Sequence, residues 1–377
     1  MPTALVLTAV SGRVTDDLVA SLRAVPGWVV VQRTALDERA WNAARARGGV
    51  WSLSVRARVL LAPLWLRHGA SHGWVPDATV VTTNPFWLPF VMALRRRRSR
   101  LIVLVYDVYP DALLVRRRLP RPALRIVRQM VRVGLQRADA VVALGGRVRD
   151  ELVRRHGLVQ PVHVIPTGSR EMLEDIDHES PPDDIAGRLD GRIVITYVGT
   201  AGEVHDVAAL GRALGRLLDL VPQDVAVVVS ARGARARELT AEVRDRPSAY
   251  VLPPLTDAEW RWVIRHTDIA CVALDRRASL VSVPSKIYPA LGAGSVILGV
   301  AEPDSDLADI IQRAGCGIVV EPENEEEILL ALLRLATKSE ERQRFQAAAR
   351  AASETTTPVA LAASWKAVLE VPPEDSD

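Results

Sequence analysis

The chain has 377 residues, of which 49% are hydrophobic and 25% are charged, with a formal net charge of +3 and two cysteines. This length suits two α/β domains, and the hydrophobic fraction is sufficient for a core in each. Two cysteines exclude a disulfide framework, and the absence of Cys and His pairs at metal-ligand spacing argues against a structural zinc site.

The charge is distributed unevenly along the chain. Residues 1–180 carry 27 Arg, no Lys and 15 acidic residues, a net charge of +12, whereas residues 181–377 have a net charge of −9. A basic half indicates that one domain meets an anionic partner. The first residues lack a positively charged start and no apolar stretch reaches about 18 residues, so we expect a cytoplasmic protein without a signal peptide or membrane-spanning helix.

Short apolar runs alternate with amphipathic, Arg-rich segments in the first half of the chain. The runs are nearly continuous in apolar residues, which is typical of strands buried on both faces of a parallel sheet. We predict strands over residues 4–8, 28–32, 78–82, 101–105, 140–144 and 162–165, with helices over 122–137 and 147–156. This alternation indicates a doubly wound α/β domain.

Two loops that follow strands in this half are candidate binding loops. Gly12 lies in a small turn after the first strand, where backbone N–H groups can meet a phosphate, although an ordinary β-to-α turn has the same composition. Asp107 and Tyr109 follow the strand over 101–105, where a carboxylate can orient a hydroxyl or hold a proton. The alternative for Asp107 is a cap of the next helix.

An acidic, Pro-containing segment around residues 171–191 predicts a linker, after which a second β/α series begins. Its predicted strands cover 193–198, 225–230, 250–252, 269–273, 296–299 and 317–320. Its predicted helices cover 207–220, 235–244, 257–265, 285–291, 304–314, 325–337, 340–352 and 359–369. Two doubly wound, Rossmann-like domains in tandem imply that they face a cleft, with ligands beyond the carboxyl ends of the strands.

Two segments of the second half combine a strand end with groups that suit a phosphate. Gly199 and Gly202 directly follow a strand and permit close approach of backbone to a ligand, and His205 adds a donor, unless it is a surface or capping histidine. Ser285 and Lys286 open the predicted helix over 285–291. A Lys in the first turn opposes the helix dipole unless an anion lies there, although a chance exposed Lys is the alternative.

Five segments in a fixed order resemble glycosyltransferase family 4, in its bacterial polysaccharide branch. They read YDVYPD over 106–111, RADAVVAL over 137–144, VIPTG over 164–168, GTAGEVH over 199–205 and VPSKIYPALGAG over 283–294. The resemblance implies the GT-B fold, with an acceptor-side domain of residues 1–172 and a nucleotide-sugar-binding domain of residues 185–352. It also implies that a C-terminal helix over 358–371 packs back on the first domain.

The resemblance further implies a retaining transfer of a sugar from a nucleotide-diphosphate sugar, without a metal or other cofactor. It assigns the donor side to Gly12, Gly199, Gly202, His205, Ser285, Lys286 and Tyr288. It assigns the acceptor side to Asp107 and Tyr109, and the catalytic roles to Asp107 and Lys286. The implied acceptor is lipid-linked or a glycan, in the synthesis of surface polysaccharide or glycoconjugate.

The chain departs from the family at positions that contact the donor. Two Glu of the family pattern fall on Val281 and Pro289, a basic pair after the glycine loop is missing, and Thr200 replaces an Asn. A nucleotide-sugar epimerase of the same fold and a non-catalytic GT-B partner protein are therefore alternatives. Product analysis without an acceptor distinguishes the epimerase from the transferase, because only an epimerase would change the free nucleotide-sugar. A titration with nucleotide-sugars tests the partner protein, because binding to none of them would favour it.

Residues 50–67 mix Trp, Leu and Val with Arg, and six of the nine tryptophans precede residue 90. Arg with Trp and Leu in one domain favours peripheral binding at the inner face of the cell membrane, which suits an acceptor carried on lipid. The alternative is a core helix or loop with solvated Arg. We expect no nucleic-acid partner, because no recognition motif is present and half of the chain is acidic.

Overall fold

The computed structural model describes residues 1–47, 49–69, 75–94, 99–116, 120–168, 179–182, 185–202, 205 and 207–370. The chain divides into two compact units, one of Met1–Thr167 with Pro358–Asp377 and the other of Gly168–Thr357. We expected domains of residues 1–172 and 185–352 from the sequence. Residues 171–178, 183 and 184 of the expected linker around 171–191 lie outside the described residues.

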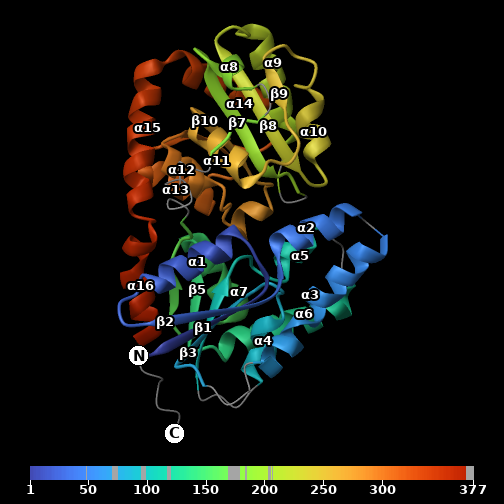
Figure 1. The fold of residues 1–377 in the computed structure, drawn as a ribbon, viewed down its shortest axis with the longest axis vertical. Helices are drawn as coiled ribbons and strands as arrows, with labels where there is room; N and C mark the ends of the chain where they lie inside the picture. The colour runs from blue at the N-terminus through green and yellow to red at the C-terminus, as the bar shows by residue number, and fades with distance from the viewer. Residues whose placement is uncertain are drawn as a thin grey trace. The chain divides into compact units, whose positions relative to one another are not determined.

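The first unit contains a six-stranded parallel sheet in the order β2-β1-β3-β4-β5-β6 (Figure 1). The strands are β1 (Thr3–Ser11), β2 (Val29–Asp37), β3 (Ala78–Thr82), β4 (Arg100–Val105), β5 (Ala140–Ala143) and β6 (Val162–Val164). Every residue of β3 and β5 is buried, as the continuous apolar runs predict for strands covered on both faces. The chain order reverses between β1 and β3, which is where open α/β sheets bind ligands.

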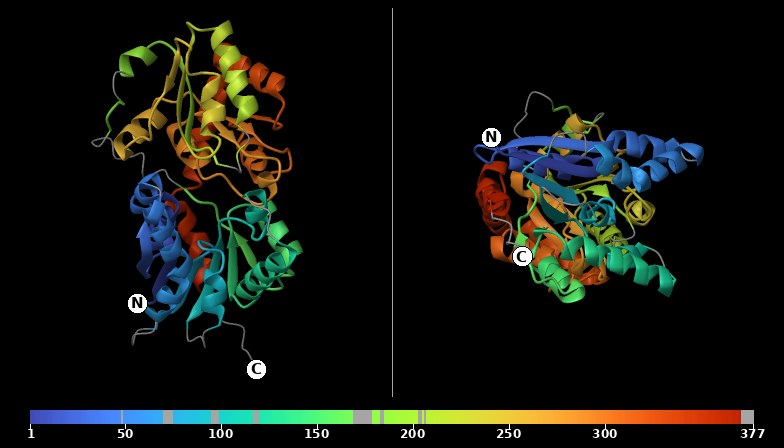
Figure 2. Two further views of the ribbon diagram at one scale, coloured as in Figure 1. Left: turned by 90° about the vertical axis from the view of Figure 1, so that its right-hand side faces the viewer. Right: turned by 90° about the horizontal axis from the view of Figure 1, so that it is seen from below.

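The helices of this unit cover the sheet and include one from the end of the chain. They are α1 (Arg13–Arg23), α2 (Glu38–Arg47), α3 (Gly49–Gly69), α4 (Leu88–Ala93), α5 (Asp111–Arg116), α6 (Arg121–Gln136), α7 (Gly146–His156) and α16 (Pro358–Glu370). α16 lies beside α1 and buries Trp365, which is 2% exposed (Figures 1 and 2). No helix among the described residues has the length and apolar character that a membrane span needs.

The second unit contains another six-stranded parallel sheet, in the order β12-β11-β10-β7-β8-β9. The strands are β7 (Ile193–Thr200), β8 (Val225–Arg232), β9 (Ala249–Val251), β10 (Ile269–Ala273), β11 (Val296–Val300) and β12 (Gly317–Val320). The chain order reverses between β7 and β10, so the loops after these two strands border the switch point.

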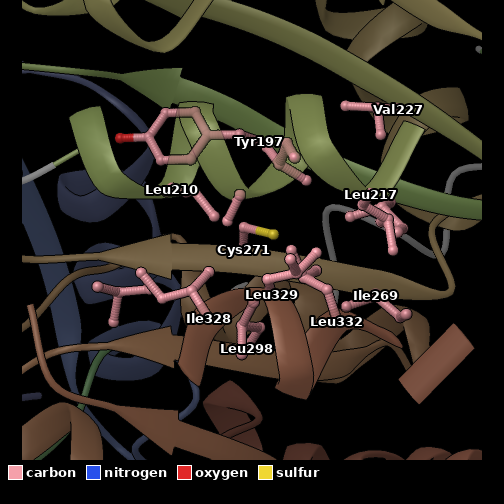
Figure 3. Close-up of a cluster of buried hydrophobic side chains, with 14 of the residues drawn as sticks. Tyr197, Leu210, Leu217, Val227, Ile269, Cys271, Leu298, Ile328, Leu329 and Leu332 are labelled. Atoms are coloured by element: carbon pink, nitrogen blue, oxygen red, sulfur yellow. The ribbon is translucent and has the colours of Figure 1, made fainter. Parts of the chain in front are cut away.

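Helices cover both faces of the second sheet. They are α8 (Ala186–Leu189), α9 (Ala208–Leu220), α10 (Ala236–Ala241), α11 (Asp257–Arg265), α12 (Ile287–Ala293), α13 (Asp306–Ala314), α14 (Glu325–Thr337) and α15 (Ser339–Glu354), with a 3₁₀ turn η3 (Ala278–Leu280). Alternate residues of β10 serve the two faces: Cys271 packs with α9 and α14 (Figure 3), whereas Val272 packs with α12 and α13. This arrangement explains the continuous apolar runs.

Several element boundaries differ from the sequence prediction, and two of the differences have a clear physical reason. β2 continues five residues beyond the predicted end at residue 32, because parallel pairing with β1 extends to Asp37 on an edge strand that tolerates polar side chains. α12 begins at Ile287 instead of the predicted Ser285. A helix that began at Ser285 would need an N–H on Pro289 to bond the Ser285 carbonyl, and proline has none.

Candidate functional site

The loop after β7 carries the two predicted glycines and the predicted histidine. Gly199 has a φ of +118°, a backbone conformation that residues with a Cβ rarely adopt. The Gly202 N–H donates to Nδ1 of His205 at 3.2 Å, and the His205 N–H donates to the Gly202 carbonyl at 3.0 Å. Because Nδ1 accepts a hydrogen bond, the neutral ring carries its proton on Nε2, where it can serve as a donor.

The turn after β8 packs directly against this loop. Gly233 has a φ of +126°, and a Cβ at this position would lie 2.5 Å from the Ala201 carbonyl oxygen. The Arg235 N–H donates to the same oxygen at 3.0 Å, and its guanidinium donates to the His205 carbonyl at 2.9 Å. Sequence reasoning missed Arg235, whose signal is a basic residue in the loop after the neighbouring parallel strand.

Lys286 extends to the end of β7. Its Nζ donates to the Tyr197 hydroxyl at 3.0 Å and to the Thr200 carbonyl at 3.1 Å, and it lies 4.2 Å from the centroid of the Tyr197 ring. Burial lowers the pKa of Lys286 to about 7. The ammonium is therefore poised to gain stability from a nearby anion, because a negative charge would raise its pKa again.

Tyr197 is a second residue that the sequence reasoning missed. Its ring is fully buried in the core of the second unit near Cys271 (Figure 3), and its hydroxyl donates to the Thr200 carbonyl at 3.0 Å. Burial raises the pKa of Tyr197, and it raises the pKa of Cys271 to about 12, so both groups stay protonated at neutral pH. The Tyr197 side chain that contacts the Lys286 ammonium is therefore uncharged.

The other residues of the VPSKIY segment take different positions. Lys286 is the N-cap residue of α12, so the prediction of a Lys inside the first turn is corrected. Ser285 is exposed in the turn before the helix, and its carbonyl accepts from the Tyr288 N–H at 3.3 Å. Tyr288 is 3% exposed and packs in the core between β10, α12 and α13. Its side chain does not line the surface of the loop.

The family positions that lack Glu are also buried. Val281 is 3% exposed, and Pro289 lies buried in the first turn of α12, where an N–H has no partner within the helix. Lys286 after β10 and Arg235 after β8 are thus the cations that contact the glycine loop, and no carboxylate stands at these two family positions.

The predicted residues of the first unit follow β1 and β4. Gly12 is the N-cap of α1 in extended backbone, and a Cβ there would collide with the Glu38 carboxylate. Burial raises the pKa of nearby Asp16, and the charge of Glu38 raises it further. This acidic surrounding argues against a phosphate group at Gly12, which the sequence analysis assigned to the donor side.

Asp107 and Tyr109 lie in the segment between β4 and α5. Asp107 is half-buried, and α5 begins at Asp111, so Asp107 is not its N-cap residue. The ring of Tyr109 lies 5.4 Å from that of Phe86, which follows β3. Asp111 forms an ion pair with Arg155 of α7. These contacts fix the backbone that carries Asp107.

In the second unit the structure brings Gly202, His205 and Lys286 together at the ends of β7 and β10, with Arg235 reaching them from the turn after β8. In the first unit the acceptor-side residues Asp107 and Tyr109 both follow β4, whereas Gly12, predicted for the donor side, follows β1. In chemical terms, the group in the second unit combines an ammonium, a guanidinium and an imidazole near an irregular glycine loop, which suits an anionic ligand. Within the described part of the chain, no three His, Cys, Asp or Glu side chains group as a metal site.

Comparison with known proteins supports these assignments at the level of family and fold. The sequence model of Glycosyltransferase Family 4 matches residues 11–169, so the predicted resemblance is confirmed. No curated protein sequence matches significantly.

Solved structures share the fold at low sequence identity. Sucrose-phosphate synthase from Thermosynechococcus elongatus has a TM-score of 0.69 and 12% identity, with 98% of each chain covered. An α,α-trehalose-phosphate synthase (UDP-forming) from Burkholderia xenovorans in complex with glucose-6-phosphate has a TM-score of 0.71 and 13% identity, with 98% and 100% covered. An E. coli structure named for trehalose-6-phosphate and bound with UDP-2-fluoro glucose has a TM-score of 0.69 and 12% identity, with 99% and 100% covered. The GT-B fold of two Rossmann-like domains is thereby confirmed.

Proposed function

We propose that this chain, whose residues 11–169 match Glycosyltransferase Family 4, is a retaining glycosyltransferase that takes a sugar from a nucleotide-diphosphate sugar. The observation that carries the proposal is the position of Lys286 at the switch point of the second sheet, hydrogen-bonded to the end of β7. Nucleotide ligands of doubly wound domains bind beyond such strand ends.

The charge around the glycine loop supports a diphosphate ligand. A lysine ammonium has three N–H donors, and two of those on Lys286 hold Tyr197 and Thr200, so the third can meet a phosphate oxygen. Arg235 holds the carbonyl of His205, which keeps the imidazole in the same loop. Binding here would stabilise the diphosphate as it leaves the sugar.

Cationic side chains and oriented donors can supply this stabilisation without a metal ion, because they are placed before the reaction begins. We therefore propose a metal-independent hexosyltransferase, with Lys286 acting on the leaving diphosphate. Ser285 is exposed beside Lys286 and is proposed as a further phosphate contact. Asp107 is proposed as the acceptor-side carboxylate that orients the attacking hydroxyl, with Tyr109 beside it.

For the acceptor we propose a lipid-linked saccharide or a glycan, used in surface polysaccharide or glycoconjugate synthesis at the inner face of the cell membrane. The net charge of +12 on residues 1–180 supports an anionic acceptor such as a lipid diphosphate. One structural relative, an α,α-trehalose-phosphate synthase, is in complex with glucose-6-phosphate. A sugar phosphate is therefore the acceptor to test in parallel.

A thermal-shift screen of nucleotide-sugars tests the donor proposal, since a ligand that binds the native state raises the melting temperature. We expect one nucleotide-sugar to stabilise the wild type and to lose this effect in Lys286→Ala. Stabilisation by none of the panel would favour a non-catalytic partner protein. A sugar nucleotide changed in the absence of acceptor would favour an epimerase.

A further inference from the structure

The helix α3 exposes large apolar side chains that the proposed donor chemistry does not use. Val50, Leu53, Leu60, Leu61 and Leu64 have exposed fractions between 52% and 79%. Single exposed hydrophobic residues are ordinary, but several on one helix mark a surface that meets another apolar phase.

These side chains form one stripe. With about 100° of rotation per residue, positions 50, 53, 57, 60, 61 and 64 fall on one side of the helix. Ala62, Pro63 and Leu66 lie on the opposite side and are buried, and α3 contacts α2, β1, β2 and α4 of the first unit. The helix is thus apolar on both sides, although the protein covers only one of them.

Cationic and aromatic residues border the stripe. Arg56 lies on one edge and Arg58 on the other, and both are exposed. Trp65 is 62% exposed and Trp51 is 61% exposed, with the Arg47 guanidinium 5.6 Å from the centroid of the Trp51 ring. An apolar stripe bordered by Arg and Trp is the pattern of a helix that lies in a membrane interface.

The charge of residues 39–76 distinguishes between the partners that could cover the α3 stripe. Residues 39–76 contain no Asp or Glu. A second copy packed on α3 about a two-fold axis would oppose Arg to Arg with no carboxylate from this segment to pair them. An anionic bilayer supplies an apolar phase for the exposed stripe and negative headgroups that pair with its Arg residues.

We propose that α3 is the surface by which this chain binds an anionic lipid bilayer, with the stripe of residues 50, 53, 57, 60, 61 and 64 inserted among the acyl chains near the headgroups. The inference deepens the proposed function by naming the surface that would bring a lipid-linked acceptor within reach, and it rests on that function only for its biological purpose. Binding to vesicles needs neither donor nor acceptor, so its failure would leave the transfer proposal standing.

The test is flotation of the full chain with vesicles of phosphatidylcholine alone or mixed with phosphatidylglycerol. The test variant is Leu60→Ser with Leu64→Ser, and the matched control is Leu220→Ser with Leu330→Ser, which removes two leucines of 59% and 56% exposure from the second unit. All four side chains are largely exposed, so circular dichroism and thermal melting should report intact folds. Tryptophan quenching by brominated acyl chains, compared between wild type and Trp65→Phe, reports whether α3 itself enters the bilayer.

The expected result is binding to the anionic vesicles, weaker binding to phosphatidylcholine alone, and a loss on the order of tenfold for each α3 leucine replaced. The control should bind as the wild type does, and Trp65→Phe should lose part of the quenching. No binding to anionic vesicles, or equal binding by the α3 variant, would overturn the proposal. A concentration-dependent dimer that the α3 variant abolishes, without vesicle binding, would instead assign the stripe to a second copy of the chain.

Discussion

Replacing Lys286 by methionine should separate the stability of this protein from its affinity for a donor. Methionine keeps the length of the side chain and removes the charge. The Tyr197 hydroxyl keeps its hydrogen bond to the Thr200 carbonyl at 3.0 Å, so the substitution leaves no buried donor without a partner. The fold should therefore persist.

The magnitude of the stability change follows from the depressed pKa. Folding lowers the pKa of Lys286 from 10.5 to about 7, and since each pKa unit is worth about 1.4 kcal/mol, the ammonium costs the folded protein on the order of a few kcal/mol below pH 7. Between pH 7 and 10.5 the unfolded chain binds the proton that the folded chain has lost, so wild-type stability rises with pH across this window. Lys286→Met should consequently melt at a higher temperature than the wild type at pH 6, with a smaller difference at pH 9.

The same substitution should weaken binding of the nucleotide-sugar. A hydrogen bond to a charged group contributes about 1.5–3 kcal/mol, which corresponds to a loss of roughly 10- to 100-fold in affinity. Wild-type affinity should itself fall above pH 7, about tenfold per pH unit, because the neutral amine must take up a proton to bind the diphosphate. Isothermal titration calorimetry from pH 6 to 9 measures both effects. An unchanged dissociation constant in Lys286→Met, or a flat pH dependence in the wild type, would refute the role given to the ammonium.

Three further predictions concern the surroundings of Lys286. Tyr197→Phe removes the hydroxyl that lies 3.0 Å from the Lys286 Nζ, but the Thr200 carbonyl at 3.1 Å remains. The KM for the donor should therefore rise a fewfold without loss of the fold. An unchanged KM and pH profile would show that the hydroxyl does not position the lysine. Gly233→Ala places a Cβ 2.5 Å from the Ala201 carbonyl at a φ of +126°, so it should destabilise the chain by about 1–3 kcal/mol and weaken donor binding. Gly187→Ala in α8, where a Cβ meets nothing within 4 Å, is the control that should be neutral or stabilising. Transfer should be unchanged after dialysis against EDTA, and activity restored only by added Mg²⁺ or Mn²⁺ would contradict the metal-independent proposal.

Much of the architecture could be predicted from the sequence because central strands of parallel sheets leave a strong pattern. β3, β10 and β12 have the same bounds in the structure as in the prediction. Of these, β3 and β10 are central strands that are buried on both faces, so polar residues mark their ends, whereas β12 is a short apolar strand at the edge of its sheet. β2 is an edge strand, and its polar second half concealed its length.

The composition of the candidate site was harder to predict because it depends on contacts between distant segments. Lys286 and Thr200 are 86 residues apart in the chain, and the hydrogen bond between them in the structure shows that the VPSKIY segment approaches the glycine loop. The sequence does not show this approach. Arg235 reaches that loop from the turn after β8, which no motif of the sequence marks. The start of α12 was predictable in principle, because the missing N–H of Pro289 excludes Ser285 as a helical residue.

The measurement that tests the central claim most directly is the incubation of the chain with single nucleotide-sugars, with and without a lipid-linked or sugar-phosphate acceptor, followed by mass spectrometry and NMR of the products. We predict that one nucleotide-sugar releases its nucleoside diphosphate and passes its sugar to an acceptor with retained anomeric configuration, and that Lys286→Met suppresses this release. A nucleotide-sugar that returns with an altered sugar and no transfer, or a chain that binds no nucleotide-sugar at all, would contradict the assignment of this protein as a glycosyltransferase.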